Sequence, residues 1–73
     1  MEEDTGFYRV TYDAIHNEIR VFPMEQEMFG PRRNCVEVID TWLKIYAVHV
    51  CAANIEKGQE LGEILLKNYV GEE

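Results

Sequence analysis

The sequence predicts a single α+β domain, in which a small antiparallel sheet of three or four strands, in ββββα order, carries one C-terminal amphipathic helix. Two observations lead to this fold class. Runs of aromatic and β-branched residues, which suit a pleated strand, recur from residue 7 to residue 51. A helical repeat of apolar residues follows them. With 73 residues, the chain has room for one domain (residues 1–73) with a thin hydrophobic core.

The N-terminal part is expected to form a β-hairpin. Phe7–Tyr12 is dense in aromatic and β-branched residues, and Glu18–Phe22 alternates charged and apolar side chains, as a half-buried strand does. Asp13–Asn17 between them supplies residues that are compatible with a turn. Pro23 lacks a backbone N–H, so it either ends the second strand or marks it as an edge strand. Residues 1–5 are polar and are expected to fray.

Two interpretations compete for residues 35–52. The segment Asn34–Glu37 matches a capping box and could begin a helix. Many of the residues that follow are β-branched, however, and a single helix accommodates such a set poorly. We therefore favour two strands, Cys35–Ile39 and Leu43–Cys51, with Asp40–Thr41 at the bend, while the helical alternative stays open.

The residues from Asn54 onward predict an amphipathic helix that lies on the sheet. Asn54 is a favoured N-cap, and Glu56 lies in the first turn, where the helix dipole favours an acid. Gly58 and Gly62 are expected to permit a close approach to the sheet, and Gly71 is placed to end the helix. At about 100° per residue, one arc of the helix gathers Ile55, Gly58, Leu61, Gly62, Leu65, Leu66 and Tyr69.

The charge balance favours a protein partner over a nucleic acid. Seven basic residues face fourteen acidic ones, which gives a formal charge of −7. Such a surface repels nucleic acid and anionic membranes, and it attracts basic protein surfaces over one Debye length, roughly 8 Å at physiological salt. The arginines and lysines are dispersed, so they form no stripe that would track a phosphate backbone.

The chain is expected to be cytoplasmic. Its first four residues, Met-Glu-Glu-Asp, are opposite in charge to the start of a secretory signal. Its longest stretch without a formal charge is far too short for a membrane span. Cytosolic thiols stay reduced, so Cys35 and Cys51 are predicted to be free.

No motif for catalysis or metal binding is recognisable. His49 and Cys51 would share one strand face, but His16 and Cys35 lie at no zinc-motif spacing from them. We therefore expect Cys35, His49 and Cys51 to pack in the core. The chain contains no serine and no glycine-rich phosphate loop, and nothing in the sequence holds two of its carboxylates in one pocket. The sequence predicts no cofactor, no metal and no enzymatic activity.

These properties are similar in type to those of small phage or mobile-element proteins, such as anti-CRISPR and anti-restriction proteins. The expected function is that of a non-enzymatic inhibitor that docks on a basic, nucleic-acid-binding surface of a host protein, with carboxylates imitating phosphates. We expect binding neither to nucleic acid nor to a membrane, and homodimer formation stays open. The alternative is a homo-oligomeric module that binds a small anionic ligand, such as a nucleotide, through Arg32, Arg33 and tyrosines at a subunit interface.

Two groups of carboxylates are candidate partner-binding sites. Glu56, Glu60 and Glu63 form a stripe on the helix face opposite the apolar arc, a geometry that follows from their spacing. A second group is expected to cluster around the hairpin and the loop after it. It consists of Asp13, Glu18, Glu25 and Glu27.

The segment Met24–Asn34 is the least regular part of the chain and is the third candidate site. Gly30-Pro31 interrupts it. Phe29 could serve as an apolar anchor for a partner, together with Met24 and Met28. Arg32 and Arg33 could clamp an anion or a carboxylate.

Overall fold

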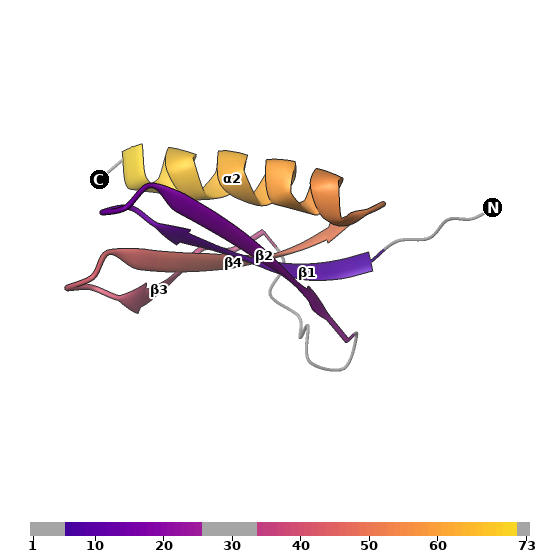
Figure 1. Cartoon of the computed structure of the whole chain (residues 1–73), viewed down its shortest axis with the longest axis horizontal. Helices are drawn as coiled ribbons and strands as arrows, with labels where there is room; N and C mark the ends of the chain where they lie inside the picture. Colours follow the sequence, from indigo (N-terminus) through magenta and orange to yellow (C-terminus); the bar gives the residue numbers. More distant parts are fainter. Residues whose placement is uncertain (1–5, 26–33, 72–73) are drawn as a thin grey trace.

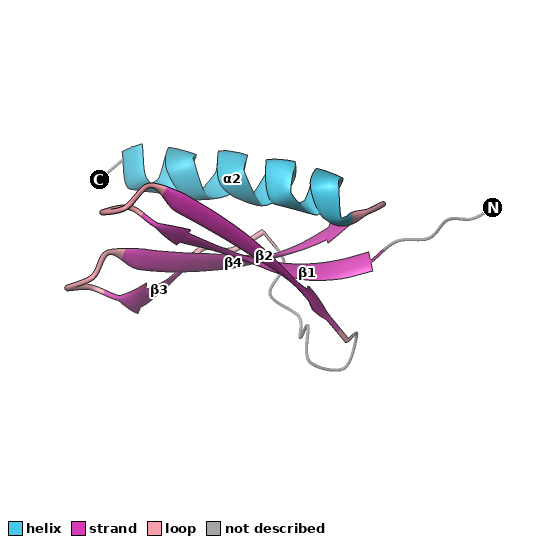
Figure 2. Ribbon diagram, viewed as in Figure 1, coloured by secondary structure: helices cyan, strands magenta, loops and turns pink. Residues whose placement is uncertain are grey.

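The computed structural model describes residues 6–25 and 34–71 of the chain. Within these ranges, four strands form one antiparallel sheet, and a helix runs along one of its faces (Figure 1). In chain order the elements are β1 (Gly6–Asp13), β2 (Glu18–Met24), β3 (Glu37–Asp40), β4 (Ile45–Ala52) and α2 (Ile55–Gly71). The strands lie in the order β2-β1-β4-β3, so two hairpins meet along the central pair β1–β4. The predicted α+β fold in ββββα order is confirmed (Figure 2).

The hydrophobic core lies between helix α2 and the three strands that it covers. Side chains alternate along each strand, so Val10 of β1 shares the covered face with its partners Val21 of β2 and Val48 of β4. Leu66 reaches down from the helix and is fully buried. The buried cluster consists of Val10, Tyr12, Tyr46, Val48, Val50 and Leu66.

Two glycines let α2 approach the sheet closely. A Cβ at position 62 would lie 2.5 Å from the Cβ atom of Val10, and a Cβ at position 58 would lie 2.9 Å from the ring of Tyr8. Any larger residue would push the helix off the strands, since branched and aromatic side chains in a packed core have little freedom to move aside. The predicted role of Gly58 and Gly62 is confirmed.

The ends of α2 also agree with the sequence prediction. The side-chain Oδ1 of Asn54 accepts a hydrogen bond from the backbone N–H of Lys57 at 2.8 Å, as an N-cap does. The helix ends at Gly71. Ile55 departs from the predicted apolar arc, because this first helical residue remains 43% exposed.

The segment after residue 34 forms strands, so the helical alternative is wrong. Strand β3 begins two residues after the predicted start at Cys35, and β4 begins at Ile45, two residues after Leu43. The later start of β4 arises because the turn between the strands, residues 41–44, is longer than the predicted bend. In the first hairpin, Pro23 lies inside β2, and β2 is an edge strand, as its proline indicated.

Candidate functional site

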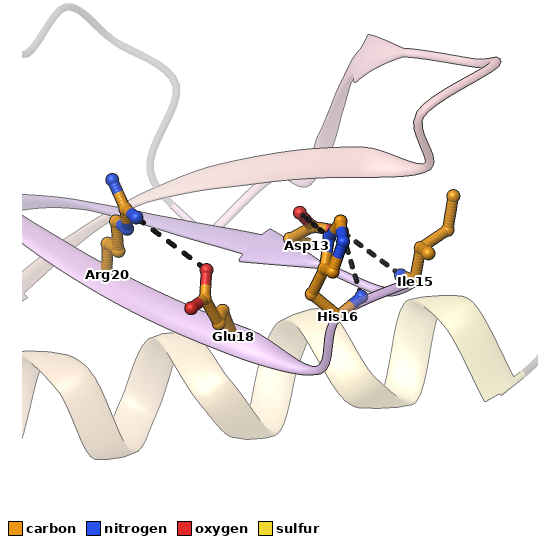
Figure 3. A network of polar contacts seen from close by, with 5 residues as sticks. All are labelled: Asp13, Ile15, His16, Glu18 and Arg20. Atoms are coloured by element: carbon orange, nitrogen blue, oxygen red, sulfur yellow. Dashed lines mark hydrogen bonds and ion pairs between the residues drawn. The ribbon is translucent and has the colours of Figure 1, made fainter.

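The turn between β1 and β2 is held by one aspartate. Asp13 Oδ1 accepts hydrogen bonds from the backbone N–H groups of Ile15, at 3.1 Å, and His16, at 3.2 Å (Figure 3). Asn17, four residues after the aspartate, adopts a left-handed conformation with φ of 56° and accepts a hydrogen bond from the Tyr12 hydroxyl. Asparagine tolerates this conformation better than most residues, which explains its place here.

The turn between β3 and β4 has the same construction. Asp40 Oδ1 accepts a hydrogen bond from the backbone N–H of Leu43 at 2.9 Å. Lys44, four residues after this aspartate, has a φ of 56°, equal to that of Asn17 in the first turn. A lysine gains no local hydrogen bond from the left-handed conformation, so this turn carries backbone strain that the first turn avoids.

The two turns lie side by side at one end of the sheet. The backbone N–H of Ala14 donates a hydrogen bond to the backbone carbonyl of Lys44 at 3.0 Å, which joins them directly. Figure 1 shows that helix α2 ends at the same end of the molecule. Side chains from both turns therefore belong to one surface.

This surface carries the most exposed large apolar side chain of the described residues. Trp42, two residues after Asp40 and at the second position of the β3–β4 turn, is 92% exposed. Ile15 occupies the same position in the other turn and points away from α2 (Figure 3); it is 58% exposed. Leu43 and Ile39 are 55% and 47% exposed. We name these four residues the turn-end patch: Ile15, Ile39, Trp42 and Leu43.

The sequence prediction did not include Trp42 among the candidate binding residues. This residue stands between the predicted bend at Asp40–Thr41 and the predicted strand from Leu43, so it belonged to neither element. The left-handed residue of this turn is a lysine, a residue type that carries no turn signal in the sequence.

His16 and Asp13 form the clearest ionisable pair of the turn end. His16 Nδ1 lies 2.8 Å from Asp13 Oδ2 (Figure 3). The side-chain hydrogen bond to Asp13 raises the pKa of His16 above its usual 6.5, and the same bond lowers the pKa of Asp13 below 3.8. A histidine held by a carboxylate also occurs in nucleophilic sites. Here the half-buried thiol of Cys51 lies at the other end of the sheet, opposite Phe7, so the pair lacks that nucleophile.

The predicted helical stripe lies on the exposed side of α2, and lysines balance part of its charge. Glu56 and Glu60 are exposed, while Glu63 is half-buried. Lys67 Nζ lies 2.9 Å from Glu63 Oε2, and Lys57 Nζ lies 4.0 Å from Glu60 Oε1. The ion pair with Glu63 raises the pKa of Lys67. The stripe therefore presents less uncompensated negative charge than its three carboxylates suggest.

The predicted acidic cluster around the first hairpin is wrong as a single group. Asp13 and Glu18 are partners across the β1–β2 pair, next to the turn. Glu25 follows the opposite end of β2. The two ends of this strand of 7 residues are roughly 20 Å apart, so Glu25 lies far from Asp13 and Glu18. Five other residues proposed for partner binding lie outside the described residues: Glu27, Met28, Phe29, Arg32 and Arg33.

The expected core packing of the cysteines and His49 is also wrong. Cys35 precedes β3 and is exposed. His49 and Cys51 are half-buried on the sheet face that α2 leaves open, since they are partners of Arg9 and Phe7 in the register with β1. Within residues 6–25 and 34–71, no three histidine, cysteine or acidic side chains come together in a way that could hold a metal ion.

The open face of the sheet has a broad depression beside β2. It encloses about 550 Å³ and is lined by Arg9, Thr11, Phe22, Pro23, Met24 and Glu25. The Nε atom of Arg9 is buried there and has no hydrogen-bond partner among the described residues. A buried donor without a partner is unfavourable, so this arginine is the strongest candidate for an anion contact on that face.

None of the helices in the described part of the chain has the length and apolar character needed to cross a membrane. Comparisons of the chain with protein-family models, with curated proteins and with solved structures yield no match.

Proposed function

We propose that this chain is a non-enzymatic binding protein that docks on another protein through its turn-end patch. One observation carries the proposal: Trp42 is 92% exposed in a turn whose backbone is fixed by Asp40. Tryptophan is enriched among the residues that dominate binding energies at protein interfaces. A turn held by its own hydrogen bond loses little conformational freedom on binding, which favours affinity.

The charge of the chain supports a partner with a basic surface. The formal charge of −7 attracts such a surface and repels nucleic acid and anionic lipid. We propose further that the partner is a host nucleic-acid-binding protein and that docking inhibits it, as phage or mobile-element inhibitors do. In this proposal Trp42 supplies affinity, and the acidic surface supplies the rate and the selectivity of encounter.

Affinity capture with matched variants tests the proposal. The tagged chain and its Trp42→Ala and Ile64→Ala variants are incubated with a bacterial lysate, and the bound proteins are identified by mass spectrometry. Ile64 is 59% exposed on α2, away from the turn-end patch, so it serves as the control. We expect a basic protein that the parent chain and Ile64→Ala retain and that Trp42→Ala loses. Equal capture by all three chains would contradict the role of the patch.

Salt dependence separates the electrostatic part of the proposal from the apolar part. Affinity for the captured partner is expected to fall steeply between low and moderate salt, because the screening length shortens. An affinity that does not change with salt would remove the basic surface from the proposal and leave apolar docking alone.

Binding of a small anion is a second candidate, favoured by the buried Arg9 Nε in the depression beside β2. Glu25 at the rim of this depression opposes an anion and makes the candidate weaker. A rise in melting temperature with nucleotides, which Arg9→Gln abolishes, would support it. The absence of any such shift at millimolar nucleotide would eliminate it.

A further inference from the structure

The depression beside β2 combines apolar walls with one charge of each sign. Phe22, Pro23 and Met24 supply the apolar side chains, and Phe22 is 47% exposed. Arg9 comes from the neighbouring strand β1, where it is the register partner of Phe22. Glu25 lies directly after the end of β2 and is exposed. A ligand in this depression therefore meets an apolar surface that lies between a cation and an anion.

Arg9 is held in place but is not engaged by an acid. Its Nε atom is buried without a hydrogen-bond partner, and within residues 6–25 and 34–71 no carboxylate forms an ion pair with its guanidinium group. The side chain as a whole is half-buried, so the two Nη atoms are its accessible donors. A guanidinium group whose stem is already packed loses little conformational freedom when it binds a carboxylate.

The charges around Arg9 select against a simple anion. Glu25 at the rim repels a second negative charge, and a chain with a formal charge of −7 repels anions at longer range. A zwitterion avoids both effects, because its net charge is zero. Its carboxylate can meet Arg9 while its ammonium group meets Glu25. The glutamate that disfavours an anion thus becomes a second point of recognition for a zwitterion.

The register indicates the distance that such a zwitterion must span. Glu25 follows Phe22, the partner of Arg9, by three residues. At about 3.3 Å per residue, the two backbone positions are roughly 10 Å apart along the strand. An extended chain spans about 3.5 Å for each of its residues. A dipeptide or a tripeptide therefore matches this distance better than a free amino acid does.

We propose that the depression beside β2 binds a short apolar peptide of two or three residues with free ends. Its C-terminal carboxylate pairs with Arg9, its ammonium group pairs with Glu25, and its side chains cover Phe22 and Met24. The inference rests on the second candidate function for the role of Arg9, and it replaces the bare anion by a ligand that Glu25 accepts. Met24 and Glu25 lie at the end of β2 remote from the β1–β2 turn, so the site is separate from the turn-end patch.

Nuclear magnetic resonance titration with three dipeptides tests the two ends of the ligand separately. The probe is Leu-Phe with free ends; acetyl-Leu-Phe lacks the ammonium group, and Leu-Phe amide lacks the carboxylate. We expect the free dipeptide to shift the amide resonances of Phe22 and Met24. It should bind about tenfold more tightly than the amide and about threefold more tightly than the acetylated form.

Three results of this titration would overturn the inference. The first is that the free dipeptide does not bind at millimolar concentration. The second is that it binds no more tightly than one of the blocked forms. The third is that it shifts only resonances outside the depression.

Two variants assign each end of the peptide to its residue. Arg9→Gln should abolish the preference for the free dipeptide over the amide, and Glu25→Gln should abolish the preference over the acetylated form. Arg20→Gln and Glu18→Gln are the matched controls, because they remove the same charges near the β1–β2 turn and should keep both preferences. A preference that survives in the Arg9 or Glu25 variant, or is lost in its control, would contradict the assignment. If Arg9→Gln does not fold, the blocked dipeptides and Glu25→Gln still decide.

The same probes distinguish failure of the inference from failure of the proposed functions. Binding of a nucleotide that Arg9→Gln abolishes, without binding of the dipeptide, would overturn the inference and leave the second candidate function standing. Binding of neither would remove the depression as a site. Binding of the dipeptide by a chain that captures no partner through Trp42 would support the inference and remove docking at the turn-end patch.

Discussion

The core beneath α2 and the turn-end patch contain similar apolar residues in opposite environments. Leu66 is fully buried on the covered face of the sheet, whereas Leu43 is 55% exposed in the β3–β4 turn. The difference comes from coverage, because one helix that approaches closely at Gly58 and Gly62 packs chiefly on three of the four strands. The hydrophobic core therefore forms without the patch residues, which remain exposed. The patch residues are therefore free to serve a partner.

Substitution of the two leucines tests most sharply whether the core and the patch contribute differently to stability. Leu66→Ala should destabilise the chain by about 3 kcal/mol, through lost burial and the cavity that remains. Leu43→Ala should change the free energy of unfolding by less than about 0.5 kcal/mol, as is usual at exposed sites. Urea denaturation followed by circular dichroism measures both values. Similar losses in the two variants would show that the patch belongs to the folding core.

Two glycines of α2 give a second matched pair. Gly62→Ala should destabilise the chain by about 2 kcal/mol, since the new Cβ would overlap the side chain of Val10 and force the helix away from β1. Gly71→Ala meets nothing within 4 Å of its new Cβ and should leave stability nearly unchanged. A Gly62→Ala variant as stable as Gly71→Ala would contradict the close packing of helix and sheet.

Much of the covered side could be predicted from the sequence, because local patterns determine it. The Asn54 N-cap, the two glycines on the apolar arc and the β-branched runs each identify an element without knowledge of the rest of the fold. The turn-end patch could not be predicted in this way. The exposure of Trp42 depends on the length of the β3–β4 turn, whose left-handed residue is a lysine and gives no turn signal in the sequence. The proximity of Ile15 to this turn depends on the pairing of β1 with β4, which is a long-range contact.

The same limit explains the failed expectations for the cysteines and the acidic cluster. Cysteine is often buried, but Cys35 lies before β3, where none of the described elements covers it. Glu18 and Glu25 are close in sequence, yet an extended strand carries them to opposite ends of the sheet. The usual burial of cysteine and the closeness of the glutamates in sequence were misleading, because the positions of these residues depend on the arrangement of the strands.

Relief of the strain in the β3–β4 turn should raise the stability of the chain. This gain should be smaller than the losses expected for Leu66→Ala and Gly62→Ala. Lys44→Asn places a residue that tolerates the left-handed region at the position equivalent to Asn17. We expect stability to rise by up to about 1 kcal/mol, while the affinity for the partner stays the same or improves. Urea denaturation checks the first value and titration calorimetry the second. A destabilised variant would show that Lys44 contributes a contact that offsets its strain.

The smallest expected effect is the pH dependence of the β1–β2 turn. The hydrogen bond to Asp13 raises the pKa of His16, so its stabilising contribution is fully present below pH 6.5 and is lost as the pH rises through the higher pKa of the folded state. Asp13 has a lowered pKa, and its contribution is lost only as the pH falls through that lowered value. In Asp13→Asn, the pKa of His16 should move down toward 6.5 in a proton resonance titration. An unchanged pKa would mean that the pair does not form in solution.

Trp42 is expected to serve binding and to contribute little to the stability of the fold. Trp42 is the only tryptophan in the chain, so a fluorine-labelled tryptophan gives one resonance that reports on it alone. In the free chain this resonance should respond fully to a solvent paramagnetic agent, and Trp42→Ala should unfold at the same urea concentration as the parent chain. On addition of the captured partner, the resonance should shift and lose its response to the agent. A resonance that stays equally accessible in the complex, or a Trp42→Ala variant that unfolds much earlier, would contradict the account.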